Sequence, residues 1–157
     1  MSQAFPMSEL HRIVLTSSLT VFAGITVFVV GQWVVKFVIE PLSEQAKITG
    51  EITYALIYYA NIYMNPGSEK ELNKETSEAL RRLASRLLAS THAVPCYRFL
   101  HFLRMVRKKS DVVRASRKLI GLSNTVSSIS FSSGDVPNNR TRKANIIKGL
   151  GIKLIDP

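Results

Sequence analysis

The chain has 157 residues, of which 46% are hydrophobic, and it carries a formal net charge of +10 at pH 7. This length suffices for one small domain and an anchor but not for two full domains. A single cysteine, Cys96, excludes an intrachain disulfide, and the charge predicts an anionic partner such as lipid headgroups, nucleic acid or an acidic protein.

The first predicted element is a transmembrane helix at residues 13–39, which follows an N-terminal tail at residues 1–12. No charged side chain occurs in the 23 residues from Ile13 to Val35. As a helix this run would extend about 34 Å, whereas the hydrocarbon core of a bilayer is about 30 Å thick. The run is too long for the apolar part of a cleaved signal peptide, and a core helix of a soluble protein normally has a polar face. We therefore expect an uncleaved membrane span.

Several residues of this span have side chains suited to a bilayer. The hydroxyls of its Ser and Thr residues can bond the helix's own carbonyl oxygens one turn earlier, so lipid tolerates them. Trp33 and Lys36 are expected to anchor the span, since the indole is amphipathic and the lysine stem lets the ammonium reach water. Gly24 and Gly31 lie near one helical face and predict helix–helix contact in a homo-oligomer, although glycine is common in membrane helices in any case.

The orientation of the span depends more on the rest of the chain than on its flanks. Arg12 precedes the span, and Lys36 and Lys47 follow it, so the nearby charges favour neither orientation strongly. The long, basic remainder with one cysteine favours the cytoplasm over an oxidising compartment. We expect the N-terminus outside and the C-terminus in the cytoplasm.

Residues 40–125 are expected to form a basic helical domain. Glu40-Pro41 should end or kink the span, because proline lacks an amide hydrogen and clashes with the preceding turn. No alternating strand pattern occurs, so the expected fold is all-α, with an N-terminal transmembrane helix followed by a small helical bundle. Apolar residues recur at helical spacing in the stretches 42–64, 68–94, 96–106 and 110–122.

Residues 48–64 admit three interpretations, because they include the apolar run ITYALIYYANIYM. Its 13 residues are too few to span a bilayer alone. We expect a buried helix, with an interfacial helix and a second span as alternatives.

Residues 126–157 are expected to form a flexible linker and a basic C-terminal segment. From Val126 to Thr141 the composition shifts to Ser, Gly, Asn and Pro, which is typical of linkers. Gly149 and Gly151 should weaken any helix in the last segment, which could dock on the core, touch a membrane or stay loose.

No catalytic residue, cofactor site or metal site emerges from the sequence. His92, Cys96 and His101 lie near one another, but their spacing matches no zinc pattern and there is no second cysteine. The chain also lacks nucleotide-binding loops and hydrolase motifs. We therefore expect a protein that is not an enzyme.

The strongest signal outside the span is the basic charge of residues 76–125, which contain eleven Lys and Arg but only two acidic residues. Arg107, Lys108 and Lys109 are expected to bind an acidic partner, either the anionic membrane surface or an acidic protein. A solvated basic face without a specific partner is the alternative.

Nucleic acid would use the same positive charges for phosphate contacts. Stacking on bases needs exposed aromatic side chains, and we expect Tyr97, Phe99 and Phe102 in the core. Nucleic acid is therefore the less favoured partner.

Three stretches together resemble a group of known proteins: LRRLASRLLAS, YRFLHFLRMV and VVRASRKLIGLSNTV. With the apolar run they resemble small bacterial membrane proteins of unassigned function, in which one N-terminal span leads into a helical cytosolic domain. The resemblance covers residues 13–125 and implies a bacterial inner-membrane location. It implies no role for any residue.

These observations predict a membrane-anchored helical interaction protein whose basic domain meets the membrane surface or an acidic protein. One alternative is a membrane-tethered nucleic-acid-binding protein. The other is an effector whose spans oligomerise and disrupt the membrane.

Overall fold

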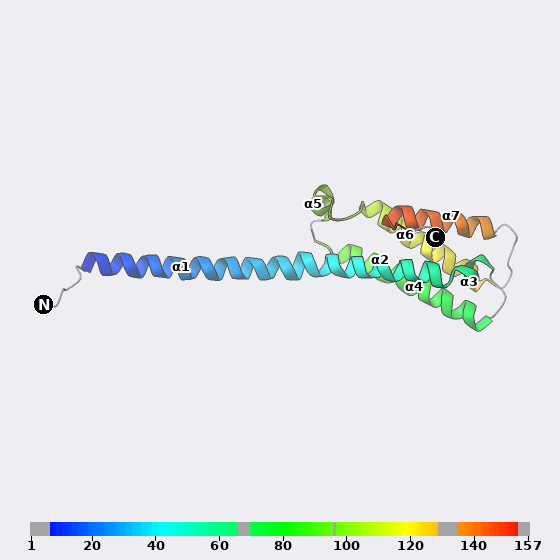
Figure 1. The fold of residues 1–157 in the computed structure, drawn as a ribbon, viewed down its shortest axis with the longest axis horizontal. Helices are drawn as coiled ribbons and strands as arrows, with labels where there is room; N and C mark the ends of the chain where they lie inside the picture. The colour runs from blue at the N-terminus through cyan, green and yellow to red at the C-terminus, as the bar shows by residue number, and fades with distance from the viewer. Residues whose placement is uncertain (1–6, 66–69, 96, 129–134, 154–157) are drawn as a thin grey trace. The chain divides into compact units, whose positions relative to one another are not determined.

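The computed structural model describes residues 7–65, 70–95, 97–128 and 135–153, and it confirms the predicted all-α fold, since these residues include no strand (Figure 1). The chain divides into two compact units, Met1–Ile39 and Glu40–Pro157. The helices are α1 (Met7–Val34), the π-helix η1 (Val35–Ile39), α2 (Glu40–Tyr58), α3 (Ala60–Met64), α4 (Lys70–Ala93), α5 (Tyr97–Phe102), α6 (Lys109–Ser127) and α7 (Asp135–Leu150).

Pro41 does not end the helix, which was one of the two outcomes expected from the sequence. Helical residues follow one another without a gap from Met7 to Tyr58, and the π-helix η1 directly precedes α2. A proline ring clashes with the carbonyl four residues earlier, which here belongs to Phe37 within η1. The wider turn of a π-helix relieves such a clash, so the backbone adjusts locally and continues.

The core of the second unit lies between α2, α4, α6 and α7. Helix α4 packs against α2 and α6, and α6 also packs against α7. Residues 48–64 contribute one face to this core, which confirms the buried-helix interpretation, while Tyr54, Ile57 and Tyr58 point outward. The fully buried side chains include Ile48, Ile52, Leu56, Tyr63, Leu80, Leu87, Leu119, Leu122 and Ile146.

Small polar residues join α4 to α6. Ser77 Oγ donates to Ser123 O at 3.0 Å, and Ser123 Oγ donates back to Ser77 O at 2.9 Å. Further along the pair, Ser116 Oγ donates to Ala84 O at 2.9 Å. All four residues are buried. Their short side chains let the two backbones approach, and their hydroxyls find carbonyl acceptors, so burial leaves these hydroxyls paired.

Helix α7 begins inside the segment that the sequence predicted to be a flexible linker, and that prediction is wrong for residues 135–141. Val126 belongs to α6, and Ile146 and Leu150 of α7 are buried in the core. Pro137 is tolerated because the amides of the first helical turn need no helical partner. The part of the expected linker at residues 129–134 lies outside the described residues.

Two glycines near the C-terminal end of α7 allow its close packing and its termination. A β-carbon at residue 149 would lie 2.9 Å from Asp111 O, so glycine permits close contact with α6. Gly151 has a φ of +66°, and Gly151 N and Ile152 N donate to Lys148 O and Ile147 O. These bonds form a Schellman motif, in which glycine at the left-handed position satisfies the last carbonyls of the helix.

Asn139 links α7 to α3 by a buried hydrogen bond. Its side chain is fully buried, its Nδ2 donates to Tyr63 O at 2.7 Å, and its Oδ1 accepts from Arg142 Nη1 at 2.9 Å. We expect Asn139→Ala to lower the free energy of unfolding by about 2–3 kcal/mol, because the carbonyl of Tyr63 loses its donor in a buried place. Urea unfolding of the detergent-solubilised protein, followed by far-UV circular dichroism, measures this loss. Asn138→Ala, at the exposed neighbouring position, should change stability by less than about 0.5 kcal/mol; equal effects for the two variants would contradict this role.

Tyr63 makes stability depend on alkaline pH. Burial raises the pKa of its phenol to about 12, and its hydroxyl donates to Leu56 O at 2.6 Å. In the unfolded chain the phenol ionises near pH 10, so its contribution is complete below about pH 10 and is lost as pH rises through about 12.

We expect the free energy of unfolding to fall by about 2–3 kcal/mol over this range in addition to any other titration. Burial also raises the pKa of Tyr59 and Tyr97. The comparison is therefore with Tyr63→Phe, whose urea midpoint should decline less steeply between pH 10 and pH 12. Parallel declines in the two proteins would rule out this contribution.

Candidate membrane anchor and basic surface

Helix α1 exposes apolar side chains on all its sides. Among the described residues, one helix, Glu9–Tyr58, is long and apolar enough to cross a membrane by length and composition, and it includes most of α1. None of its most apolar 18 residues is buried within the protein. Leu15, Phe22 and Val27 are each about 70% exposed. A surface of this kind needs a covering of lipid or protein, because apolar area in water is unfavourable.

Three threonine hydroxyls of α1 are satisfied within the helix, as the sequence predicted. Thr16 Oγ1 donates to Arg12 O at 2.6 Å, and Thr20 Oγ1 donates to Thr16 O at 2.9 Å. Thr26 Oγ1 donates to Phe22 O at 2.9 Å. These hydroxyls therefore need no water, which makes them compatible with a hydrocarbon environment.

The predicted anchoring residues lie at the end of the apolar helix. Trp33 is exposed near the end of α1, and its ring centroid lies 4.5 Å from that of Phe37. Lys36 is exposed within η1. The arrangement places an indole, a phenyl ring and an ammonium within two turns of helix. That combination is typical of the headgroup region of a bilayer, where amphipathic side chains concentrate.

Gly24 and Gly31 lie on open surface of α1. A β-carbon at either position would meet no atom within 4 Å among the described residues. The surface is therefore accessible to a second helix. Contact between copies of the chain through these glycines stays a prediction.

Several of the Lys and Arg side chains in residues 76–125 make contacts within the domain, so they are less available to a partner. Arg86 of α4 donates to Glu44 Oε1 at 2.9 Å and also to Glu51, and these hydrogen bonds raise its pKa. Arg81 donates to Asn124 Oδ1 at 2.9 Å. These contacts join α4 to α2 and α6, although each side chain of the Arg86 group is about a third or more exposed, so water screens the attraction.

The predicted acidic-partner residues lie together where the loop after α5 meets α6. Lys108 is the N-cap residue of α6, and Lys109 is its first residue. Lys109 Nζ lies 3.5 Å from His92 Nδ1. The guanidinium of Arg107 lies against Gly151, where a β-carbon would collide with it. All three residues are exposed. The structure thus keeps the three predicted cations on one surface, with the head of Arg107 placed against the end of α7.

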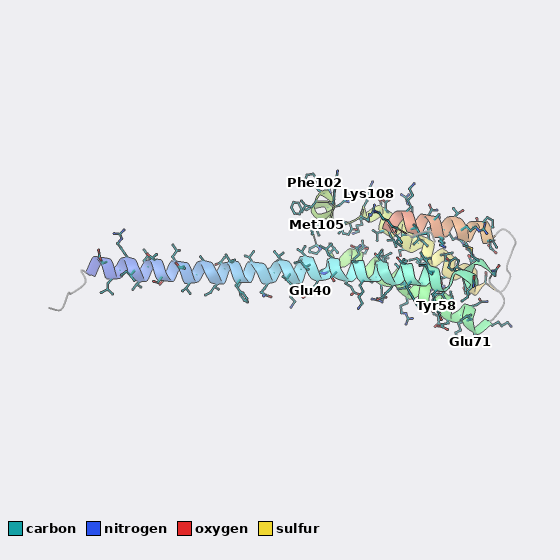
Figure 2. All side chains as sticks on the ribbon, viewed as in Figure 1. Glu40, Tyr58, Glu71, Phe102, Met105 and Lys108 are labelled. Atoms are coloured by element: carbon teal, nitrogen blue, oxygen red, sulfur yellow. The ribbon has the colours of Figure 1, made fainter. Side chains whose placement is uncertain are left out.

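Phe99 and Phe102 are not in the core, and the prediction that they would be buried is wrong. Tyr97 and Leu100 are buried, whereas Phe99 is 60% exposed and Phe102 is 81% exposed. Figure 2 shows Phe102 and Met105 beside Lys108, away from the packed helices. The physical reason is the shortness of α5: buried positions three residues apart occupy one side of a six-residue helix, and the remaining apolar residues must face outward.

The His92, Cys96 and His101 group gains no metal-site geometry from the structure. His101 Nδ1 lies 3.1 Å from Val106 O, and His92 lies beside Lys109. Cys96 is outside the described residues. Among the residues that are described, no group of three His, Cys, Asp or Glu residues is arranged to hold a metal ion.

Comparison with known proteins identifies no relative: no family model matches the chain, and neither a curated protein nor a solved structure is significantly similar to it. The functional interpretation therefore depends on the surfaces described above.

Proposed function

We propose that this protein is a single-pass membrane protein that holds a basic helical domain at the cytoplasmic face of a membrane. The function of the domain is to bind the anionic membrane surface. The observation that carries the proposal is the contrast between the two units. The second unit has its own apolar core, whereas the apolar side chains of α1 are exposed along the whole helix.

A core helix of a soluble protein and a signal sequence can match α1 in length and apolar composition. The first alternative is disfavoured because none of the described residues buries the most apolar part of α1. The second is disfavoured because the apolar run is longer than the roughly 7–15 residues of a signal peptide. Lipid around α1 explains both the exposed apolar surface and the length of the apolar run.

Carbonate extraction of membranes from expressing cells tests the anchor. We expect the full-length protein to stay in the membrane pellet, and its intact mass to include α1. Release by carbonate, or a mature N-terminus beyond Lys36, would contradict the proposal.

Fusions at the C-terminus test the orientation. We expect a green fluorescent protein fusion to fluoresce and an alkaline phosphatase fusion to be inactive, because the first folds in the cytoplasm and the second needs an oxidising compartment. The opposite pair of results would place the domain on the other side.

A further inference from the structure

The α5 loop, defined here as residues 97–109, combines positive charge with exposed apolar side chains. This segment contains five Lys and Arg residues and no acidic residue. Within the described part of the chain, no carboxylate forms an ion pair with any of the five. Four large apolar side chains of the same segment are also exposed, namely Phe99, Phe102, Leu103 and Met105.

The backbone holds this segment in a defined shape. Tyr97 is buried, and its hydroxyl donates to Arg107 O at 2.8 Å, which joins the two ends of the α5 loop. Arg104 N donates to His101 O at 2.9 Å, and Met105 N donates to Leu100 O at 3.0 Å. The two bonds form a Schellman motif that ends α5. The exposed apolar side chains are therefore presented by an ordered turn.

Two residue choices in the α5 loop oppose local stability. Arg104 has a φ of 59°, a left-handed conformation in which glycine is the favourable residue. Lys108 and Lys109 stand at the N-terminus of α6, where the helix dipole disfavours positive charge. Residues that break local rules are expected at functional sites. Here the three residues concerned, Arg104, Lys108 and Lys109, are all cations.

An open surface hollow lies between the α5 loop and the start of α6. Its volume is about 540 Å³, and its lining includes His101, Arg104, Arg107 and Lys108. One carboxylate, Asp111, also lines the hollow, but its Oδ1 lies 3.7 Å from Arg114 Nη2. The lining therefore has an excess of positive charge next to the exposed phenyl rings.

The α5 loop contacts the first part of α2. Gln45 interacts with the phenol of Tyr97, and its Nε2 donates to Thr91 Oγ1 at 3.2 Å. Gln45 is only six residues beyond Ile39, which corresponds to about 9 Å of helix. A surface joined to a membrane span through so few residues can reach the field of an anionic leaflet, whose Debye length is about 8 Å at physiological salt.

We propose that the α5 loop is a second membrane contact, which inserts Phe99, Phe102, Leu103 and Met105 among anionic phospholipid headgroups while its cations bind the lipid phosphates. This inference rests on the proposed membrane anchoring. Lipid fits better than nucleic acid because two of the four exposed side chains are aliphatic and offer no face for stacking on bases.

Tryptophan quenching in the full chain tests the insertion. Trp33 is the only tryptophan, so Trp33→Phe/Phe102→Trp carries one reporter in the α5 loop. The matched control is Trp33→Phe/Tyr58→Trp, whose reporter replaces an exposed aromatic residue at the end of α2 (Figure 2). Both proteins are reconstituted in nanodiscs of brominated phosphatidylcholine, with or without phosphatidylglycerol.

We expect the reporter at residue 102 to be quenched when phosphatidylglycerol is present, to recover at high salt, and to be quenched less in neutral lipid. The control reporter should stay unquenched, since residue 58 lies 19 residues beyond Ile39, or about 28 Å along a helix. An unquenched reporter at residue 102 in a protein that still elutes with nanodiscs would overturn the insertion but leave the anchor intact. A protein that fails to enter nanodiscs would overturn the anchor.

Charge removal tests the role of the cations. In the Phe102→Trp reporter protein, Arg104→Gly/Lys108→Gln should lower the ratio of docked to undocked domains about 30-fold, since each exposed cation contributes about tenfold or less near an anionic leaflet. Glycine suits the backbone at residue 104, so thermal unfolding should be unchanged or shifted upward. Unchanged quenching in this variant would refute the lipid-phosphate contact.

The last experiment adds a single-stranded oligonucleotide to the reporter protein and tests nucleic acid as the alternative partner. Quenching of the reporter at residue 102 by added oligonucleotide, with none by anionic lipid, would replace the lipid by nucleic acid as the partner. No effect of oligonucleotide together with lipid quenching supports the proposal.

Discussion

Two arginines in the middle of α1 are expected to prevent membrane insertion. Val21 and Val27 are 62% and 72% exposed, so neither substitution disturbs a contact within the protein. Each arginine at the centre of a membrane helix costs about 2.5–3.5 kcal/mol. For Val21→Arg/Val27→Arg the two penalties amount to about 5–7 kcal/mol, which shifts the partition between membrane and water by a factor of about 1,000 or more.

Flotation of cell membranes in a sucrose gradient measures this effect, because aggregated protein sinks while membranes rise. Val21→Leu/Val27→Leu serves as the control, since it changes shape at the same positions without charge, and it should float like the natural protein. A doubly arginine-substituted protein that still floats in full yield would show that lipid does not surround the middle of α1.

Removal of a core side chain from α6 is expected to destabilise the second unit by about 3 kcal/mol. Leu119 is fully buried where α6 faces α4 and α7, and nothing in a close-packed core refills the space that Leu119→Ala leaves. The adjacent Ile120 is 37% exposed and faces outward. Ile120→Ala should therefore lower stability by less than about 1.5 kcal/mol, although it removes as many carbon atoms.

Urea unfolding in detergent, followed by the far-UV circular dichroism of the full chain, compares the two variants. The expected result is a large fall in midpoint for Leu119→Ala and a small one for Ile120→Ala, with similar slopes. Comparable falls would mean that α6 does not present the face found here to the core. A loss of cooperativity in the natural protein would mean that the second unit does not fold as one body.

The helices that could be predicted from sequence are those in which apolar side chains alone specify the buried face. In α4, Leu80, Leu83 and Leu87 recur at helical spacing and all are buried. Gly121 of α6 lies at a close contact, since a β-carbon there would lie 3.1 Å from Arg142 Nε. These features need only periodicity and residue size.

Prediction failed where polar residues make the contact. Helix α7 uses Asn139 beside Ile146 and Leu150, so its buried stripe looks partly hydrophilic in the sequence. Asn139 is stable inside the protein because Tyr63 O, 76 residues earlier, accepts its amide hydrogen. A pattern of hydrophobicity contains no information about such a distant partner, and composition alone therefore indicated a linker.

The prediction of buried residues in the α5 loop failed for the opposite reason. Apolar residues occur on every side of the sequence YRFLHF, so periodicity could not indicate which of them face the core. The choice was made by Tyr97 and Leu100, which pack inward, and it left Phe99 and Phe102 exposed. The aromatic part of the candidate membrane contact thus emerged only from the structure, while its cations were already evident in the chain.

The sequence by itself determined the helical class, the long apolar segment and the concentration of positive charge, because length, hydropathy and charge are additive properties of neighbouring residues. Tertiary structure alone decided that α7 completes the core and that the α5 loop combines exposed phenyl rings with exposed cations. Those outcomes depend on which groups far apart in the chain meet, and burial of a residue is a property of its surroundings rather than of the residue.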